Sequence, residues 1–169
     1  MSFVAALRRA TAADHAAVDA AFGAFRLTDV DDYARFLTAH ARALGAIEAV
    51  LAGAPALPAW RQRLPLLAAD LAALDQPLPV PIHWAPDDPA ARWGALYVIE
   101  GSRLGGQLLA RRVPPSLPRA YLGAVHRPGE WRALLHAIEV QATASDAAWR
   151  GAAIAGARQT FALYAGAVR

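Results

Sequence analysis

A histidine and an aspartate near the N-terminus form the first candidate for chemistry. His15 and Asp19 lie four residues apart in LRRATAADHAAVD, a segment whose composition favours a helix, so both side chains fall on one helical face. A carboxylate in that position can accept a hydrogen bond from Nδ1, directly or through water, which leaves Nε2 free to bind a metal. The alternative is an exposed histidine beside acidic residues with no ligand, and the pair alone does not decide between the two.

The second candidate is a segment that places four glycines in one expected helix, WGALYVIEGSRLGGQLLARRV at 93–113. A glycine inside a helix costs about 1 kcal/mol relative to alanine, and this chain uses alanine freely. Such glycines serve either the close packing of two helices or the close approach of a flat ligand to the backbone. On a helical wheel a smooth stripe faces away from a charged and polar side: Gly94, Val98, Gly101, Ser102 and Gly105 against Glu100, Arg103, Gln107 and Arg111.

Composition excludes several other chemistries. The 169 residues contain no cysteine, which rules out disulfides, zinc thiolate sites, iron–sulfur clusters and thiolate-ligated haem. All 17 basic residues are arginines, so there is no lysine for a Schiff base or a phosphate-binding loop. The chain also lacks the Glu-x-x-His of a di-iron carboxylate bundle and the Gly-x-Ser-x-Gly of a hydrolase nucleophile.

Charge and hydropathy favour a soluble domain. The net charge is +3 and the arginines are scattered, so we expect no nucleic-acid partner. No uninterrupted apolar run reaches the roughly 18 residues that a membrane-spanning helix needs, and the N-terminus lacks the pattern of a secretory signal. We therefore expect one cytoplasmic domain over 1–169, with no membrane partner.

Helices must hold these candidate residues, and the hydrophobic spacing predicts an all-α fold. Ser2 would cap a first helix that ends near Gly23, and Thr28 with Asp31 would open a second that stops at Gly53. The proline-rich stretch 75–89 is expected to be extended. The other expected helices are 60–74, kinked or divided at Pro65, then 88–113 from Asp88 and Pro89, one from Pro128 through Ile138, and 146–168.

The sequence resembles a known family at two motifs. LRRATAADHAAVD at 7–19, followed by YVIEGSRLGGQLL at 97–109, is similar to the bacterial haem oxygenases, in particular to the group paired with bacteriophytochromes. The similarity extends over nearly the whole chain, including WRALLHAIE and the closing GARQTFALY. It implies a single haem-oxygenase-like helical bundle with a kinked, glycine-rich distal helix.

The family pattern implies roles on both sides of a bound haem. It places the iron ligand at His15, the acid behind that ligand at Asp19, and Thr11 in the same proximal motif. Ser102 stands where mammalian-type members have an aspartate that organises distal water, an acid that the bacterial subgroup also lacks. The residues that match the catalytic distal helix are Gly101, Ser102, Gly105 and Gly106.

The resemblance also implies how the haem propionates are bound. Family contacts there are often lysines, and Arg8 and Arg132 stand at matching positions, where a guanidinium can pair bidentately with a carboxylate. His136 stands where many members have a further arginine, which leaves open which meso carbon is attacked. Phe161 matches an aromatic that lines the pocket, although a place in the ordinary core would explain it equally well.

The implied activity uses haem as both cofactor and substrate. Haem would be oxidised to biliverdin, carbon monoxide and ferrous iron, with dioxygen and with electrons from an external donor such as a ferredoxin or a reductase. The subgroup further suggests that biliverdin supplies a bacteriophytochrome. Three alternatives stay open: a haem carrier or sensor of the same fold, a helical interaction module whose glycine stripe packs a partner helix, and an enzyme for another flat molecule.

Overall fold

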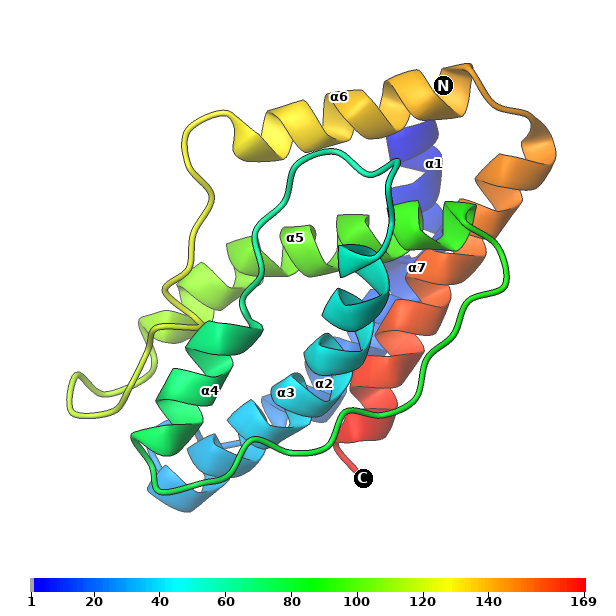
Figure 1. The fold of residues 1–169 in the computed structure, drawn as a ribbon. Coiled ribbons are helices and arrows are strands. Elements are labelled where there is room, and N and C mark those ends of the chain that lie inside the picture. The colour runs from blue at the N-terminus through cyan, green and yellow to red at the C-terminus, as the bar shows by residue number, and fades with distance from the viewer. Residues whose placement is uncertain (1) are drawn as a thin grey trace.

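The computed structural model describes residues 2–169, and that range contains seven helices and no strand. The all-α prediction is therefore confirmed. Figure 1 shows α5 lying across the bundle, with α6 along one edge of the molecule and α4 beside α3. No helix of the described range is both long and apolar enough to cross a bilayer. The helices are α1 (Phe3–Ala10), α2 (Ala12–Gly23), α3 (Val30–Ala52), α4 (Leu64–Ala72), α5 (Ala90–Ala110), α6 (Glu130–Thr143) and α7 (Ala147–Ala167).

Helices α5 and α7 pack with their backbones almost in contact. A Cβ atom added to Gly94 of α5 would lie 1.9 Å from the carbonyl oxygen of Ala153, and one added to Gly156 of α7 would lie 2.2 Å from that of Ala91. Both distances are far below van der Waals contact, so neither position accepts a side chain without movement of a helix. The two glycines therefore fix how α5 crosses α7.

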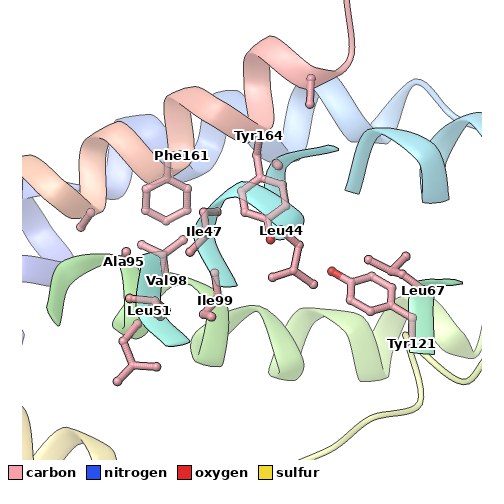
Figure 2. Close-up of a cluster of buried hydrophobic side chains, with 14 of the residues drawn as sticks. Leu44, Ile47, Leu51, Leu67, Ala95, Val98, Ile99, Tyr121, Phe161 and Tyr164 are labelled. Atoms are coloured by element: carbon pink, nitrogen blue, oxygen red, sulfur yellow. The ribbon is translucent and has the colours of Figure 1, made fainter. Parts of the chain in front are cut away.

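Apolar side chains from α3 fill the space beside this pair of helices. Each residue of the cluster is 8% exposed or less, and burying a side chain such as leucine contributes about 1.5–3 kcal/mol. This core holds the buried side of α5 rigidly. Its members, drawn in Figure 2, include Leu44, Ile47 and Leu51 of α3, Ala95, Val98 and Ile99 of α5, and Phe161 and Tyr164 of α7.

The prediction of one continuous helix from Ser2 to Gly23 is wrong, because the chain divides at Thr11. This residue has a φ of −106° and a ψ of 2°, and it separates α1 from α2. Its buried hydroxyl donates to the carbonyl of Leu7 at 2.9 Å. Hydroxyl residues offer the backbone this local alternative to the regular helical ladder, and here the bond lies at the turn between the two helices.

The starts of α3 and α6 also differ from the prediction. Thr28 does not cap α3. Asp29 does, since its carboxylate accepts from the N–H of Asp32 at 2.9 Å. Helix α6 begins two residues after Pro128, because Gly129 adopts a φ of 85° that a helical residue cannot have. Both errors are shifts of one or two residues, the usual uncertainty of a helix end.

Helix α4 is shorter than expected, and a residue of α3 sets its start. It begins at Leu64 instead of near Trp60, with Pro65 in its first turn, where a missing N–H does no harm. Glu48 of α3 supplies the cap: its two carboxylate oxygens accept from the N–H groups of Arg63 at 2.7 Å and Leu64 at 3.1 Å. The partner of this helix start lies in another helix, so local sequence did not reveal it.

The other boundaries agree more closely. Residues 75–89 contain no helix and run as an extended segment along the outside of the bundle (Figure 1). The carboxylate of Asp88 accepts from the N–H of Ala90 at 2.8 Å where α5 begins, and α5 ends at Ala110, three residues before the expected Val113. Asp146 caps α7 through the N–H of Trp149.

Candidate active site

His15 and Asp19 form the pair that their spacing predicts. Nδ1 of His15 lies 3.3 Å from Oδ2 of Asp19, and the two side chains are 63% and 67% exposed. Because Nδ1 faces the carboxylate, Nε2 is available to an incoming ligand. The edge of the imidazole meets the ring of Phe161 from α7, with ring centroids 5.6 Å apart at 86°. A carboxylate on one side and an aromatic ring on the other thus orient the imidazole.

The surface of α2 around His15 is smooth and open. Among the residues of this helix only Phe22 is buried, so α2 leaves most of its length uncovered by other helices. On the His15 side of α2 lies the methyl group of Ala12, whereas the exposed Ala13, Ala16, Ala17 and Ala20 are turned about 100° or more away around the helix. A flat group bound to Nε2 of His15 would therefore meet a small side chain at Ala12.

The glycines of α5 have different surroundings along the helix. Gly94 is packed against α7, as described above. A Cβ on Gly101 would lie 3.3 Å from the indole of Trp131, and one on Gly106 would lie 3.4 Å from the carbonyl oxygen of Leu122. A Cβ on Gly105 would have no atom within 4 Å. Helix packing therefore explains Gly94, and Gly105 alone among these positions borders open space.

Two leucines that the sequence analysis missed flank Gly105. Leu104 is 46% exposed and Leu108 is 61% exposed, and with Gly101 and Gly105 they occupy one face of α5 at i, i+3, i+4 and i+7. Scattered exposed leucines need no explanation, but two on one turn beside an open glycine make an apolar face without a protein partner. The signal was present in the sequence as leucines four residues apart within the glycine-rich motif.

Ser102 forms hydrogen bonds on the buried side of this face. Its hydroxyl donates to the carbonyl of Ile99 at 2.6 Å and accepts from Nη2 of Arg63 at 2.7 Å. Arg63 is only 2% exposed and precedes α4. The sequence analysis gave this arginine no role, because nothing near it in the chain indicates a contact with α5.

Two of the charged residues on the other side of the glycine helix, Glu100 and Arg103, are buried, whereas Gln107 and Arg111 are exposed. Nε of Arg103 donates to both carboxylate oxygens of Glu100, at 3.0 and 2.9 Å. The other nitrogens of this guanidinium reach the carbonyls of Ala124 and Arg61. His126 lies 3.3 Å from Glu100, and burial lowers the pKa of its imidazole, although the carboxylate opposes this. These bonds attach two loops to the back of α5.

Aromatic rings connect α1, α5 and α6 beside Gly101. The rings of Tyr97 and Trp131 lie 5.8 Å apart at 32°, with the indole against Gly101. Burial raises the pKa of Tyr97, and the positive charge of Arg8 acts in the opposite direction. Arg8 therefore lies within electrostatic range of this aromatic pair, although its own side chain is exposed.

The remaining expected site residues have other surroundings. Arg132 and His136 are exposed one turn apart on α6, and in the described residues neither contacts His15, Phe161 or the glycines. The hydroxyl of Thr11 is buried and donates to Leu7. The structure thus brings His15, Asp19 and Phe161 together, and it leaves Arg132 and His136 apart from them.

The residues present fit a flat group that carries a metal. His15 offers Nε2 above a smooth helical surface, and Gly105 with its two leucines offers an open apolar face on α5. No group of three or more histidine, cysteine, aspartate or glutamate side chains in residues 2–169 could hold a metal ion. The chemistry of this donor set, a neutral imidazole with a carboxylate behind it, suits an iron porphyrin held by one protein ligand.

Comparison with known proteins decides the family. Over 151 residues, 80% of this chain and 88% of the relative, the sequence is 38% identical to a heme oxygenase of Xanthomonas campestris pv. campestris. The chain belongs to the haem oxygenase family. No protein-family model matches it. The enzyme class expected from the sequence is therefore confirmed, and haem is the group that proteins of this family bind.

Solved structures agree with the family at the level of the fold. The NO- and CO-bound heme oxygenase of Neisseria meningitidis superposes with a TM-score of 0.83 at 23% identity, covering 100% of this chain and 91% of that one. The heme oxygenase of Leptospira interrogans gives a TM-score of 0.71 at 18% identity, covering 99% and 98%. The helical bundle of this chain is thus a haem oxygenase fold over its whole length.

Proposed function

We propose that this haem oxygenase binds haem between α2 and the Gly105 face of α5 and cleaves it to biliverdin, carbon monoxide and ferrous iron. The arrangement around His15 carries the proposal, because an exposed imidazole paired through Nδ1 presents Nε2 as the iron ligand. Bound haem supplies the iron that activates dioxygen and the macrocycle that is oxidised. Electrons come from an external donor, a ferredoxin or a reductase.

Asp19 and Phe161 hold the imidazole of His15 in one orientation. Oδ2 of Asp19 lies 3.3 Å from Nδ1 of His15, and a proton shared across this contact would favour the tautomer whose Nε2 carries a lone pair. The ring of Phe161 limits rotation of the imidazole. Because both His15 and Asp19 are largely exposed, water weakens the interaction between them. Thr11 acts indirectly, by forming the turn that separates α2 from α1.

The distal residues give shape and exclude water. Without a side chain at Gly105, the backbone of α5 can approach a bound group closely, and a kink of α5 at its glycines is part of this proposal. Leu104 and Leu108 cover the edges of that group with apolar surface. No histidine or arginine lies on this face to cleave an O–O bond as in a peroxidase, and in this proposal water ordered beside Ser102 delivers the protons. Gly101 and Gly106 shape the same helix by letting Trp131 and Leu122 pack against it.

Arginine replaces lysine at the propionates in this proposal. Arg8 already lies near Tyr97 and Trp131 at one end of the Gly101 region. Arg132 and His136 on α6 would supply the second contact, which sets the rotation of the macrocycle and hence the carbon that is attacked. Biliverdin would go to a bacteriophytochrome in the cytoplasm, where reduced donors are present.

The test is an optical titration of the purified chain with hemin, followed by ascorbate or reduced ferredoxin in air. We expect a saturable Soret band that decays into the broad red absorption of biliverdin, with carbon monoxide released. His15→Ala should remove the histidine-ligated spectrum, while His83→Ala, at an exposed histidine in the 75–89 segment, should not. A stable Soret band under both reductants would indicate a haem carrier, and an unchanged spectrum in His15→Ala would refute the ligand.

A further inference from the structure

Arg63 is a buried cation without an ion-pair partner. It is 2% exposed, and no carboxylate lies within ion-pairing distance of its guanidinium in residues 2–169. Its Nε has no hydrogen-bond partner there. The guanidinium carbon lies 5.0 Å from the centre of the Tyr121 ring. Glu48 accepts from the backbone N–H of Arg63, so this carboxylate fixes the main chain and partly balances the charge.

Arg103 provides a contrast on the same helix. Its guanidinium is equally buried but pairs with both oxygens of Glu100 and also binds two loop carbonyls. Those bonds are sufficient to attach the loops to α5. The guanidinium of Arg63 reaches neutral groups instead: Nη2 donates to the carbonyl of Ile99 and to Oγ of Ser102. A buried charge is costly to keep, so a purely structural link does not explain the choice of an arginine.

These bonds determine what the Ser102 hydroxyl can offer. A hydroxyl has one proton and two lone pairs. The proton is donated to Ile99, and one lone pair accepts from Arg63. Only the second lone pair is left. Ser102 can therefore accept a hydrogen bond from a neighbouring water or ligand, but it cannot donate one while its proton is donated to the carbonyl of Ile99.

We propose that Arg63 is a positioning residue of the distal site, which fixes the Ser102 hydroxyl as a hydrogen-bond acceptor toward the haem side of α5. The inference rests on the proposed function, since it concerns the face on which haem would lie. It reverses the simplest expectation for a distal serine, that of a proton donor. Protons would then reach the distal side through water that donates to Ser102.

The direction in which a spectral pH midpoint moves tests whether the Ser102 hydroxyl accepts or donates a hydrogen bond. Ferric haem proteins change colour with pH as water on the open side of the iron loses a proton. An acceptor hydroxyl stabilises the water form, so Ser102→Ala should lower that midpoint by about half a pH unit, the equivalent of one net hydrogen bond. A rise of the midpoint would mean that Ser102 donates, which overturns the proposal.

Arg63→Lys completes a double-mutant cycle. Lysine keeps the charge but is one bond shorter, so the lone pair of Ser102 that Arg63 occupies is freed. The hydroxyl can then rotate away from the carbonyl of Ile99 and turn its proton outward. The midpoint should fall by a similar amount, and the double variant should resemble Ser102→Ala alone, because Arg63 acts through Ser102. Additive shifts, or no shift in a folded Arg63→Lys, would show a structural role only. Arg42→Lys, at an arginine that binds the carbonyl of Ala167, is the matched control.

A measurement without haem separates this inference from the proposed function. In the haem-free, 15N-labelled protein, Ser102→Ala should shift the guanidinium N–H signals of Arg63, whereas Thr143→Ala, which removes an exposed hydroxyl bonded to the carbonyl of Glu139, should not. Unshifted Arg63 signals would refute the contact even if Arg63→Lys fails to fold. If the Arg63 signals shift but the chain takes up no hemin, the proposed function is refuted and the distal role of Arg63 falls with it. If the chain cleaves haem normally but the pH midpoints of Ser102→Ala and Arg63→Lys do not move, the inference alone is refuted.

Discussion

The two halves of α5 use glycine for opposite reasons. In the first half, Gly94 lets the backbone of α7 approach so closely that a Cβ would lie 1.9 Å from a carbonyl oxygen. In the second half, Gly105 has no neighbour within 4 Å, and exposed Leu104 and Leu108 lie beside it. In the first half the backbone of α7 packs against Gly94, whereas in the second half the space beside Gly105 holds no atom of the described residues within 4 Å.

A glycine inside a helix lowers the stability of the protein unless other contacts offset its cost. Each one costs about 1 kcal/mol relative to alanine. At Gly94 the packing of α7 offsets this cost within the folded chain. At Gly105 no atom of the described residues lies within 4 Å to offset it, and the proposed function accounts for this glycine by a haem lying against it.

The largest expected effect is that of Gly94→Ala. The new methyl group would collide with backbone atoms of Ala153 and Ala157, which cannot turn aside as a side chain would. We expect a loss of about 3 kcal/mol or more in the free energy of unfolding, measured by urea denaturation of the haem-free protein. The same substitution at Gly105 meets no atom and should stabilise the protein by about 0.5–1 kcal/mol. Equal effects at the two positions would remove the distinction between the halves.

The next effect concerns the open half and haem itself. Gly105→Leu should weaken haem binding about tenfold or more, since the side chain would occupy the space of the ligand, while the far-UV helical signal stays. Gly151→Leu is the matched control, because Gly151 is also an exposed helical glycine with no atom within 4 Å. Equal hemin affinities in the two variants would show that Gly105 does not border the haem.

The next prediction concerns the pH dependence of the unfolding free energy, to which the buried imidazole of His40 should contribute. Burial among Phe22, Phe36 and Tyr164, and next the charge of Arg63, lower the pKa of His40 from 6.5 to about 3. The unfolded chain takes up this proton more readily, so the stabilisation is complete above pH 6.5 and falls as the pH drops toward 3.

His40→Gln isolates that contribution. Glutamine can keep the bond to the Tyr121 hydroxyl, which lies 2.9 Å from Nδ1, but it does not titrate. Between pH 6.5 and 4 the unfolding free energy of the parent should fall more steeply than that of the variant, by up to about 1.4 kcal/mol per pH unit. Burial raises the pKa of Glu48 and Asp70, and this opposite contribution cancels because both proteins contain it. Parallel curves would mean that His40 does not titrate in this range.

The smallest effect is expected at Asp19. Because the pair with His15 is largely exposed, Asp19→Ala should change the unfolding free energy by less than about 0.5 kcal/mol. Haem affinity should fall several-fold, below the roughly 10- to 100-fold seen when a buried partner of a metal ligand is removed. Asp14 lies on the same helix as Asp19 and pairs with Arg158 of α7. Asp14→Ala should leave haem affinity unchanged. Identical hemin titrations for both variants would exclude a role of Asp19 behind the ligand.

Much of the fold could be predicted because its signals are local. The end of α3 near Gly53, the extended proline-rich segment 75–89 and the extent of α7 each depend on residues close together in the chain. The errors arose where a distant group decides. Glu48 sets the start of α4 from another helix, and the chain divides at Thr11 although its alanines favour one continuous helix.

The candidate site shows the same division. The spacing of His15 and Asp19 predicted their contact, which is confirmed, since four residues in a helix always place two side chains on one face. The spacing of the glycines left two explanations open: close helix packing is confirmed at Gly94, and the approach of a ligand stays a prediction at Gly105. Nothing in the sequence indicated Arg63, whose contacts lie 36 and 39 residues away.

Residue types and spacing were enough to predict that this chain is helical, that His15 has an acid one turn away, and that four glycines fall in one helix. These are properties of residue type and of the helical repeat. Only the tertiary structure decided which glycine faces a helix and which faces open space, and which donor holds Ser102. Those outcomes depend on which surfaces meet in three dimensions, and the periodicity of a single helix carries no information about its neighbours.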